Sequence, residues 1–280
     1  LRRLKELAHE VNGETVVLTF WPHPRLVLNG DETSLKLLNT FDEKAALLEQ
    51  AGINHLVQMP FTEEFSHLSP REYVQRILVD KLKTEFLIIG YDHRFGQNRE
   101  GGFDYLQANA ADFGFQVEEI PRQDIDDIGV SSTKIRQALE TGDVATAHTY
   151  LGRPYEITGT VVDGDKIGRG MGFPTANISI AEKYKLIPDD GIYAVRVLHE
   201  DQWYGGMLYI GNRPTLAKTN KTIEVNIFDF DADIYGEQQI LQAAILPREI
   251  LESARRYLPA CRGLQPPQGL WGHISGIDLV

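Results

Sequence analysis

Short apolar runs alternate with helical patterns through the first half of the chain. Four runs, rich in β-branched and aromatic side chains, favour strands at residues 15–20, 53–59, 86–90 and 115–120. The segments between them repeat apolar residues at helical spacing. Parallel strands need helical crossovers between them, so this order predicts a Rossmann-like α/β domain.

Two of the predicted helices carry explicit start signals. Thr40 and Glu43 have the spacing of a capping box, in which each residue satisfies a backbone amide of the other. Ser69 and Glu72 repeat this spacing, and Pro70 stands at the first helical position. We therefore expect helices to begin at both places.

The pattern changes near residue 150. Turns rich in Gly, Pro, Asp and Asn separate further strand patterns at residues 157–162, 191–198, 203–210 and 222–230. Without long helices between them, these strands predict an all-β antiparallel barrel or sandwich. Periodicity is lost after about residue 259, which predicts a poorly ordered tail. The expected organisation is a first domain at 1–150, a second at 151–258 and an atypical tail at 259–280.

The amino-acid composition restricts the kinds of partner that the protein can bind. The 280 residues contain 28 Lys plus Arg against 40 Asp plus Glu, a formal net charge of −12. This balance disfavours a nucleic-acid partner, which needs a basic surface, but a local cluster of cations and amides can still bind phosphate. The single Cys261 excludes an intrachain disulfide and fits a reducing compartment. With no apolar run of about 18 residues, we expect no membrane partner and a cytoplasmic protein.

Three polar clusters stand where strands of the first domain are expected to end. They are TFWPHPR at 19–25, GYDHRFG at 90–96 and VSSTKIR at 130–136. Ligands of open parallel sheets bind outside the carboxyl ends of the strands, so we expect the clusters to converge on one nucleotide site. The candidate nucleotide-binding residues are His23, Asp92, Arg94, Ser132, Thr133 and Arg136.

Each cluster also has a simpler interpretation. Hydroxyls and amides at a helix N-terminus favour phosphate, but Ser-Ser-Thr before a helix is more often only an N-cap. Asp92 and Arg94 can bind a second substrate or a metal-bound phosphate, or form a surface ion pair. His23 can donate to a phosphate oxygen, or stand in a turn stiffened by its neighbouring prolines. Spacing alone therefore indicates only a nucleotide-binding α/β domain.

The segment GDKIGRGMGFPTAN at 164–177 holds the densest group of candidates. Its glycines let the backbone approach a ligand and its cations add charge, which suits a phosphate site as well as a simple hairpin. It lacks the ending of a P-loop. The candidate ATP- and phosphate-binding residues here are Gly164, Lys166, Gly168, Arg169, Gly170 and Gly172.

Three further side chains offer oxygen ligands. Thr175 and Asn177 are two positions apart on an extended segment, so both point to one side and can bind one Mg²⁺. Glu224 alternates with the apolar Ile223 and Val225, which places it on the opposite face of that strand. It is either a functional carboxylate or part of a solvated outer face.

These segments resemble the prokaryotic bifunctional riboflavin kinase/FAD synthetase family. The segments 164–177, 209–215 (YIGNRPT) and 224–236 are similar to its riboflavin kinase module, and the three first-domain clusters are similar to its FMN adenylyltransferase module. The resemblance covers roughly residues 1–240. It implies a six-stranded barrel that transfers the ATP γ-phosphate to the riboflavin 5′-hydroxyl, with Mg²⁺ and phosphate at Thr175 and Asn177 and Glu224 as general base.

The resemblance also implies that the first domain passes AMP from ATP to FMN and releases pyrophosphate. The family's Phe-Asp-Gly-x-His-x-Gly-His segment is expected just ahead of Leu1 and does not occur in the chain, so we expect riboflavin phosphorylation to exceed FAD formation. His93 and Asn226 replace the family's usual Phe and His. After about Gln239 the family's final strand and helix are not recognisable.

Two other functions stay open from the residues. One is a nucleotidyltransferase acting on another phosphorylated vitamin, which the first domain alone would support. The other is a flavin- or nucleotide-binding protein without turnover. The oligomeric state does not follow from the sequence.

Overall fold

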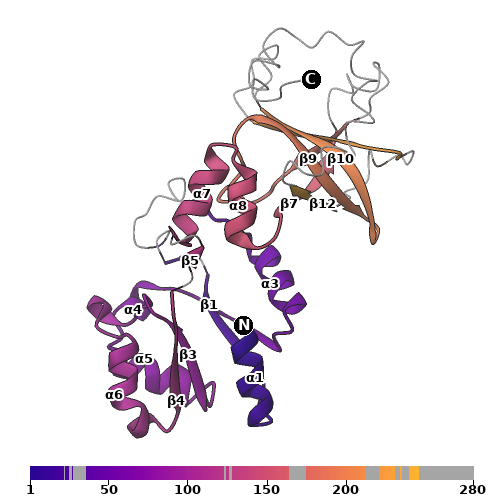
Figure 1. The fold of residues 1–280 in the computed structure, drawn as a ribbon. Helices are drawn as coiled ribbons and strands as arrows, with labels where there is room; N and C mark the ends of the chain where they lie inside the picture. Colours follow the sequence, from indigo (N-terminus) through magenta and orange to yellow (C-terminus); the bar gives the residue numbers. More distant parts are fainter. Residues whose placement is uncertain are drawn as a thin grey trace. The chain divides into compact units, whose positions relative to one another are not determined.

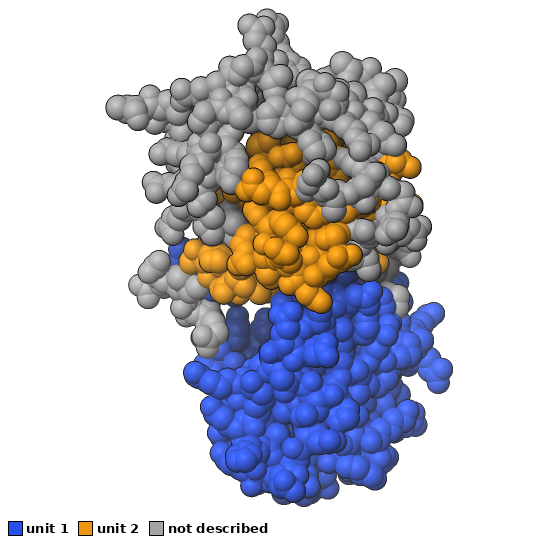
Figure 2. Space-filling model, turned by 90° about the vertical axis from the view of Figure 1, so that its right-hand side faces the viewer, with its two compact units in different colours: residues 1–130 blue, residues 131–280 orange. Residues whose placement is uncertain are grey.

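The computed structural model describes residues 1–21, 23–24, 27, 36–122, 124–125, 128–163, 175–211, 221–230, 234 and 240–245. The chain divides into two compact units, unit 1 at residues 1–130 and unit 2 at residues 131–280 (Figure 2). The helices α7 (Ser132–Glu140) and α8 (Val144–Leu151) belong to unit 2 by their contacts. One such contact is the hydrogen bond from the Asp189 amide to the Leu139 carbonyl, at 3.0 Å.

Unit 1 alternates strands and helices, as its hydrophobic pattern predicts (Figure 1). Its elements in chain order are α1 (Arg2–Glu10), β1 (Val16–Phe20), α3 (Phe41–Gln50), β2 (His55–Met59), α4 (Glu63–Ser66), α5 (Pro70–Tyr73), the π-helix η1 (Val74–Val79), β3 (Phe86–Gly90), the 3₁₀-helix η2 (Gln97–Arg99), α6 (Phe103–Phe113), β4 (Gln116–Ile120), β5 (Asp124–Ile125) and β6 (Ile128–Gly129). β1 pairs with β2 and β3 pairs with β4, both in parallel. Among the described residues the parallel strands thus form two pairs, not one continuous sheet.

The two predicted capping boxes are confirmed. The Thr40 hydroxyl accepts a hydrogen bond from the Glu43 amide at 3.1 Å, and the Glu43 carboxylate accepts one from the Thr40 amide at 3.0 Å. Ser69 and Glu72 form the same reciprocal pair. The second helix then continues from α5 into η1, whose wider turns the sequence pattern does not indicate.

One apolar core serves both strand pairs of unit 1. Val74 and Leu106 are completely buried, and Ile89 of β3 lies among them. Leu18 of β1 and Met59 of β2 pack against the same cluster. The two pairs therefore share one hydrophobic core although no described strand joins them.

Unit 2 contains a closed barrel in which every neighbouring pair of strands is antiparallel. Its strands are β7 (Tyr155–Val162), β8 (Ala176–Ser179), β9 (Gly191–His199), β10 (Gln202–Gly211), β11 (Thr222–Ile227) and β12 (Ile240–Ile245). The order around the barrel is β10-β11-β8-β7-β12-β9. Closure leaves no free sheet edge, and the predicted all-β domain is confirmed as a barrel.

The last strand corrects one expectation. The sequence after about Gln239 shows no recognisable strand, yet β12 occupies the gap between β7 and β9. Its isoleucines favour a strand and its alanines do not, and pairing on both edges adds to the preference of the isoleucines. Ile245 anchors it in the core at 1% exposure. The predicted tail at 259–280 lies outside the described residues.

Among the helices that the structure describes, none combines the length and apolar character needed to cross a membrane.

Candidate functional site

Three predicted site residues of the barrel lie side by side on its outer face. Glu224 of β11 and Asn177 of β8 are directly opposite in the antiparallel register, and Thr175 stands immediately before β8. Directly opposed residues share one face of a sheet. Their neighbours Val225 and Ala176 point into the core, at 0% and 3% exposure. Strand alternation thus places Asn177 and Glu224 outward together.

A hydrogen bond joins two members of this group. The Thr175 hydroxyl donates to Oε2 of Glu224 at 3.2 Å, across 49 residues of sequence. Glu224 is only 8% exposed, so its interpretation as a solvated strand residue is not supported. A buried carboxylate with one oxygen held in place is suited to accept a proton from a substrate hydroxyl.

The opposite neighbour of Glu224 received no role from the sequence. Tyr209 of β10 pairs with Glu224 on its other side. Its ring lies over Gly211, where an added Cβ would stand 2.5 Å from the Tyr209 hydroxyl oxygen. The glycine of the YIGNRPT segment thus makes room for an aromatic ring beside the carboxylate.

The glycine-rich segment cannot be placed in this site. Its candidate residues lie outside the described residues, namely Gly164, Lys166, Gly168, Arg169, Gly170 and Gly172. Their role in phosphate binding stays a prediction.

In unit 1, the TFWPHPR cluster follows β1 as predicted. Trp21 comes directly after the strand and packs on Phe41 with ring centroids 5.5 Å apart, while His23 is half-buried. Lys44 of α3, to which the sequence pattern gave no role, also reaches this region, and its ammonium group donates to the Thr19 hydroxyl at 3.0 Å. Nothing in the sequence spacing connects α3 to the end of β1.

The GYDHRFG cluster follows β3. Asp92 and Arg94 are exposed, and no ion pair joins them in the described part of the chain. The Arg94 guanidinium instead lies directly against Gly102, the residue that precedes α6. Desolvation lowers the pKa of His93; the charge of the neighbouring Asp92 opposes this shift, and the charge of Arg99 adds to it.

The VSSTKIR cluster begins α7. The Ser131 hydroxyl accepts a hydrogen bond from the Lys134 amide at 3.3 Å, so the N-cap interpretation is confirmed for Ser131. Ser132 and Thr133 are exposed in the first turn, and Arg136 is half-buried.

Convergence of the three clusters stays a prediction. The TFWPHPR and GYDHRFG candidates belong to unit 1, whereas Ser132, Thr133 and Arg136 belong to unit 2.

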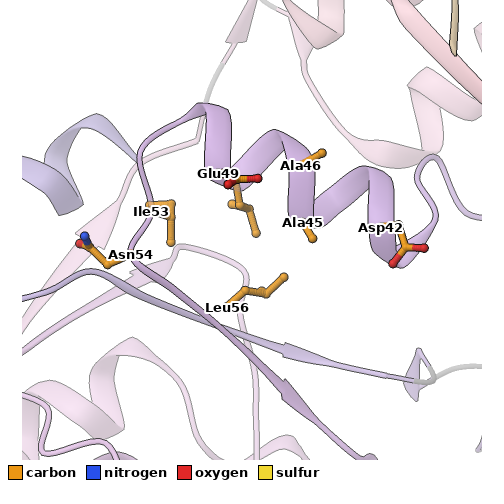
Figure 3. Close-up of a pocket in the computed structure, with 8 residues that line it drawn as sticks. Asp42, Ala45, Ala46, Glu49, Ile53, Asn54 and Leu56 are labelled. Atoms are coloured by element: carbon orange, nitrogen blue, oxygen red, sulfur yellow. The ribbon is translucent and has the colours of Figure 1, made fainter. Parts of the chain in front are cut away.

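A surface pocket of unit 1 has none of these candidates in its lining (Figure 3). It is lined by Asp42, Ala45, Ala46, Leu48, Glu49, Ile53, Asn54 and Leu56. Asp42 and Glu49 are its charged lining residues, and Asn54 already accepts hydrogen bonds from the backbone and hydroxyl of Thr15. An acidic lining without a cation does not suit a nucleotide phosphate.

Three family models match parts of the chain. The FAD synthetase family model matches residues 1–134, and the riboflavin kinase model matches residues 151–248. A model for circularly permuted ATP-grasp type 2 proteins matches residues 226–280, overlapping the end of the kinase match.

Curated relatives carry both modules in one chain. The bifunctional riboflavin kinase/FMN adenylyltransferase of Listeria monocytogenes is 38% identical over 239 residues, covering 85% of this chain and 75% of the relative. The proteins of the same description from Haemophilus influenzae and Escherichia coli are 37% and 34% identical, covering 85% and 84% of this chain and 76% and 75% of the relatives.

A solved structure agrees over most of the chain. It is the crystal structure of a macrolide-efflux protein from Streptococcus pneumoniae, with a TM-score of 0.78, 25% identity and coverage of 94% of this chain and 86% of that one. The two family matches and the curated relatives identify the chain as a member of the bifunctional riboflavin kinase/FMN adenylyltransferase family.

Proposed function

We propose that the chain phosphorylates riboflavin to FMN with ATP and transfers AMP from a second ATP to FMN, giving FAD. The observation that carries the proposal is the group of Thr175, Asn177 and Glu224 on the barrel face, within the riboflavin kinase match. We assign FMN adenylylation to residues 1–150 and riboflavin phosphorylation to residues 151–258.

In the kinase reaction, Glu224 is the general base. Its carboxylate orients the riboflavin 5′-hydroxyl and takes the proton as the oxygen attacks the γ-phosphorus of ATP, with ADP leaving. Phosphoryl transfer demands little covalent chemistry of the protein and depends on positioning and charge stabilisation. The hydrogen bond from Thr175 supports this role because it fixes the orientation of the carboxylate.

The donor set around Glu224 also suits a magnesium ion. Hydroxyl and amide oxygens of Thr175 and Asn177 are hard ligands of the kind that Mg²⁺ prefers, and these two residues would hold the ion. Thr175 donates its hydroxyl proton to Glu224, and this bond uses none of its oxygen lone pairs. When bound, Mg²⁺ neutralises charge on the phosphate oxygens. We assign stabilisation of the transferred phosphoryl group to Lys166, Arg169 and the neighbouring glycines.

In the adenylyl transfer, a phosphate oxygen of FMN attacks the α-phosphorus of ATP and pyrophosphate leaves. We assign nucleotide and FMN binding to the residues His23, Asp92, Arg94, Ser132, Thr133 and Arg136. Riboflavin, FMN and ATP are the partners in this proposal. The single cysteine and the ATP substrate support a cytoplasmic location.

One incubation tests the proposal. The protein is supplied with riboflavin, ATP and MgCl₂, and riboflavin, FMN and FAD are separated by chromatography; FMN is supplied in a second reaction. We expect FMN from the first reaction and FAD from the second. FAD should form more slowly than FMN. Bound flavin without any product would favour the binding-protein alternative. Turnover of another phosphorylated vitamin but not of FMN would favour the other nucleotidyltransferase.

A further inference from the structure

Lys44 is a charged residue of unit 1 that has no role in the two proposed reactions as described above. It extends from α3 to the carboxyl end of β1, where its Nζ donates to the Thr19 hydroxyl at 3.0 Å. The same Nζ lies 5.8 Å from the centre of the Trp21 ring. Lys44 therefore brings a positive charge to the strand end from which the TFWPHPR segment departs.

The surroundings of this ammonium group do not balance its charge. Lys44 is half-buried, and within the described residues no carboxylate lies in salt-bridge distance of it. Its sequence neighbour Glu43 is directed to the N-cap of α3, where it accepts from the Thr40 amide. Burial lowers the pKa of Lys44, with no acidic group acting in the opposite direction. Removing water from a charge costs free energy that a bound counter-ion offsets, so an anion at this position would stabilise the ammonium group.

The available contacts leave room for an anion. An ammonium group has three N–H donors, and Thr19 accepts one of them. The face of Trp21 adds only a weak cation–π attraction. Position, charge and remaining donors therefore match a small anion at the carboxyl end of β1, where parallel α/β sheets bind their ligands.

We propose that Lys44 binds a phosphate group of a nucleotide substrate in unit 1, with Thr19 orienting the ammonium group. The phosphate belongs either to ATP or to FMN, and both present the same oxyanion to Nζ. This inference rests on the proposed adenylyl transfer for the identity of the ligands. A merely structural lysine, which only ties α3 to β1, would show no response to either ligand.

Chemical footprinting of the full chain measures this response directly at Lys44. The protein is treated with an amine-acylating reagent alone, with MgATP, with FMN and with riboflavin, and acylation of each lysine is quantified by mass spectrometry. We expect MgATP or FMN to slow acylation of Lys44 at least fivefold, while riboflavin, which has no phosphate, leaves it unchanged. Whichever of MgATP and FMN protects Lys44 from acylation is the source of the phosphate. Lys81, an exposed lysine of the same unit, is the internal control.

A pair of variants tests the same site by affinity. Lys44→Met keeps most of the side-chain length and removes the charge, and Lys81→Met is its matched control. We expect Lys44→Met to weaken binding of the protecting ligand about tenfold, measured by calorimetry at an unchanged melting temperature, with riboflavin phosphorylation also unchanged. Equal acylation of Lys44 in all arms, or equal affinity of both variants, overturns the proposal. Protection of Lys44 without any FAD formation would retain the phosphate site and reject adenylyl transfer.

Discussion

The barrel and unit 1 hold their candidate residues in different ways. In the barrel, Asn177 and Glu224 face each other across neighbouring strands, and Thr175 bonds directly to Glu224. In unit 1, the candidates stand in segments that follow the strands, such as Asp92 and Arg94 after β3. The first group is fixed by hydrogen-bond register, whereas the second is fixed only by where each strand ends.

This difference has a physical consequence for function. A register shift of one residue would turn Glu224 to the other face, so the barrel site exists in one arrangement or not at all. Segments at strand ends can move without breaking a sheet. The Arg94 side chain, for instance, lies on Gly102 through contact and not through an ion pair. Substitutions in the barrel should therefore have sharper effects than those in unit 1.

The largest expected effect follows from removing the proposed base. Glu224→Gln keeps the shape of the side chain but cannot take a proton, so we expect kcat for riboflavin phosphorylation to fall about 10² to 10⁴-fold. FAD formation from supplied FMN should continue at the wild-type rate. Glu140→Gln, at an exposed carboxylate of the same unit, is the control. Equal loss of both reactions would mean that Glu224 supports folding and not chemistry.

A smaller loss is expected at the two proposed magnesium ligands. Thr175→Ala and Asn177→Ala should each lower kinase activity about 10- to 100-fold and raise the Mg²⁺ concentration needed for half-maximal rate. Thr175→Ser retains the hydroxyl and should keep most of the activity. A titration with MgCl₂ measures all three variants. Kinase rates like those of the wild type in both alanine variants would remove Thr175 and Asn177 from the site.

A pair of glycine substitutions compares the tolerance of the two units. A Cβ on Gly159 of β7 would stand 2.6 Å from the Ser179 carbonyl oxygen, so Gly159→Ala should separate β7 from β8 and cost about 1–3 kcal/mol. Gly102→Ala meets only the flexible end of Arg94, and we expect a change within about 0.5 kcal/mol. Urea unfolding gives both values. Equal losses would show that the backbone of unit 1 is as constrained as the barrel.

The smallest expected effect is on stability at alkaline pH. Each unit contains one tyrosine that reports it. Burial raises the pKa of Tyr73 in unit 1 and of Tyr193 in unit 2 to about 12, from an ordinary value of 10.0. A raised pKa means that the folded state holds the phenol proton more tightly, so this stabilisation is complete below pH 10 and is lost as the pH rises towards 12.

Tyr73→Phe and Tyr193→Phe should each flatten the decline of the melting temperature over this alkaline range. Tyr193→Phe should also lower stability at neutral pH, because the Tyr193 hydroxyl donates to the Asp189 carbonyl at 2.6 Å. Calorimetric scans at a series of pH values measure both effects. If neither variant changes how steeply the melting temperature declines with pH, other groups cause the loss of stability at alkaline pH.

Local chemistry made much of the fold predictable. Thr40 with Glu43 and Ser69 with Glu72 identify helix starts, because the partners of a capping box are only three residues apart. Alternation along the strands placed Glu224 opposite its apolar neighbours. Residue spacing predicted on which face of a strand a side chain lies and where helices and strands end. The chemical roles of the site residues came from the family resemblance.

Long-range pairing explains what the sequence did not predict. β12 pairs with β7 on one edge and with β9 on the other, strands that are far from it in sequence, and no local pattern encodes this pairing. The contacts of Glu224 with Thr175 and of Lys44 with Thr19 depend on register and helix placement, which single-residue patterns do not encode. The π-helical winding of η1 likewise has no local signal that we recognise.

A crystal structure of the chain with riboflavin, ADP and Mg²⁺ tests the central claim most directly. We expect the 5′-oxygen of riboflavin within hydrogen-bond distance of the Glu224 carboxylate, about 2.6–3.2 Å. We also expect Mg²⁺ bound by the oxygens of Thr175 and Asn177, next to the ADP phosphates. Riboflavin bound with its 5′-hydroxyl remote from Glu224 would contradict the assignment of this barrel face as the kinase site.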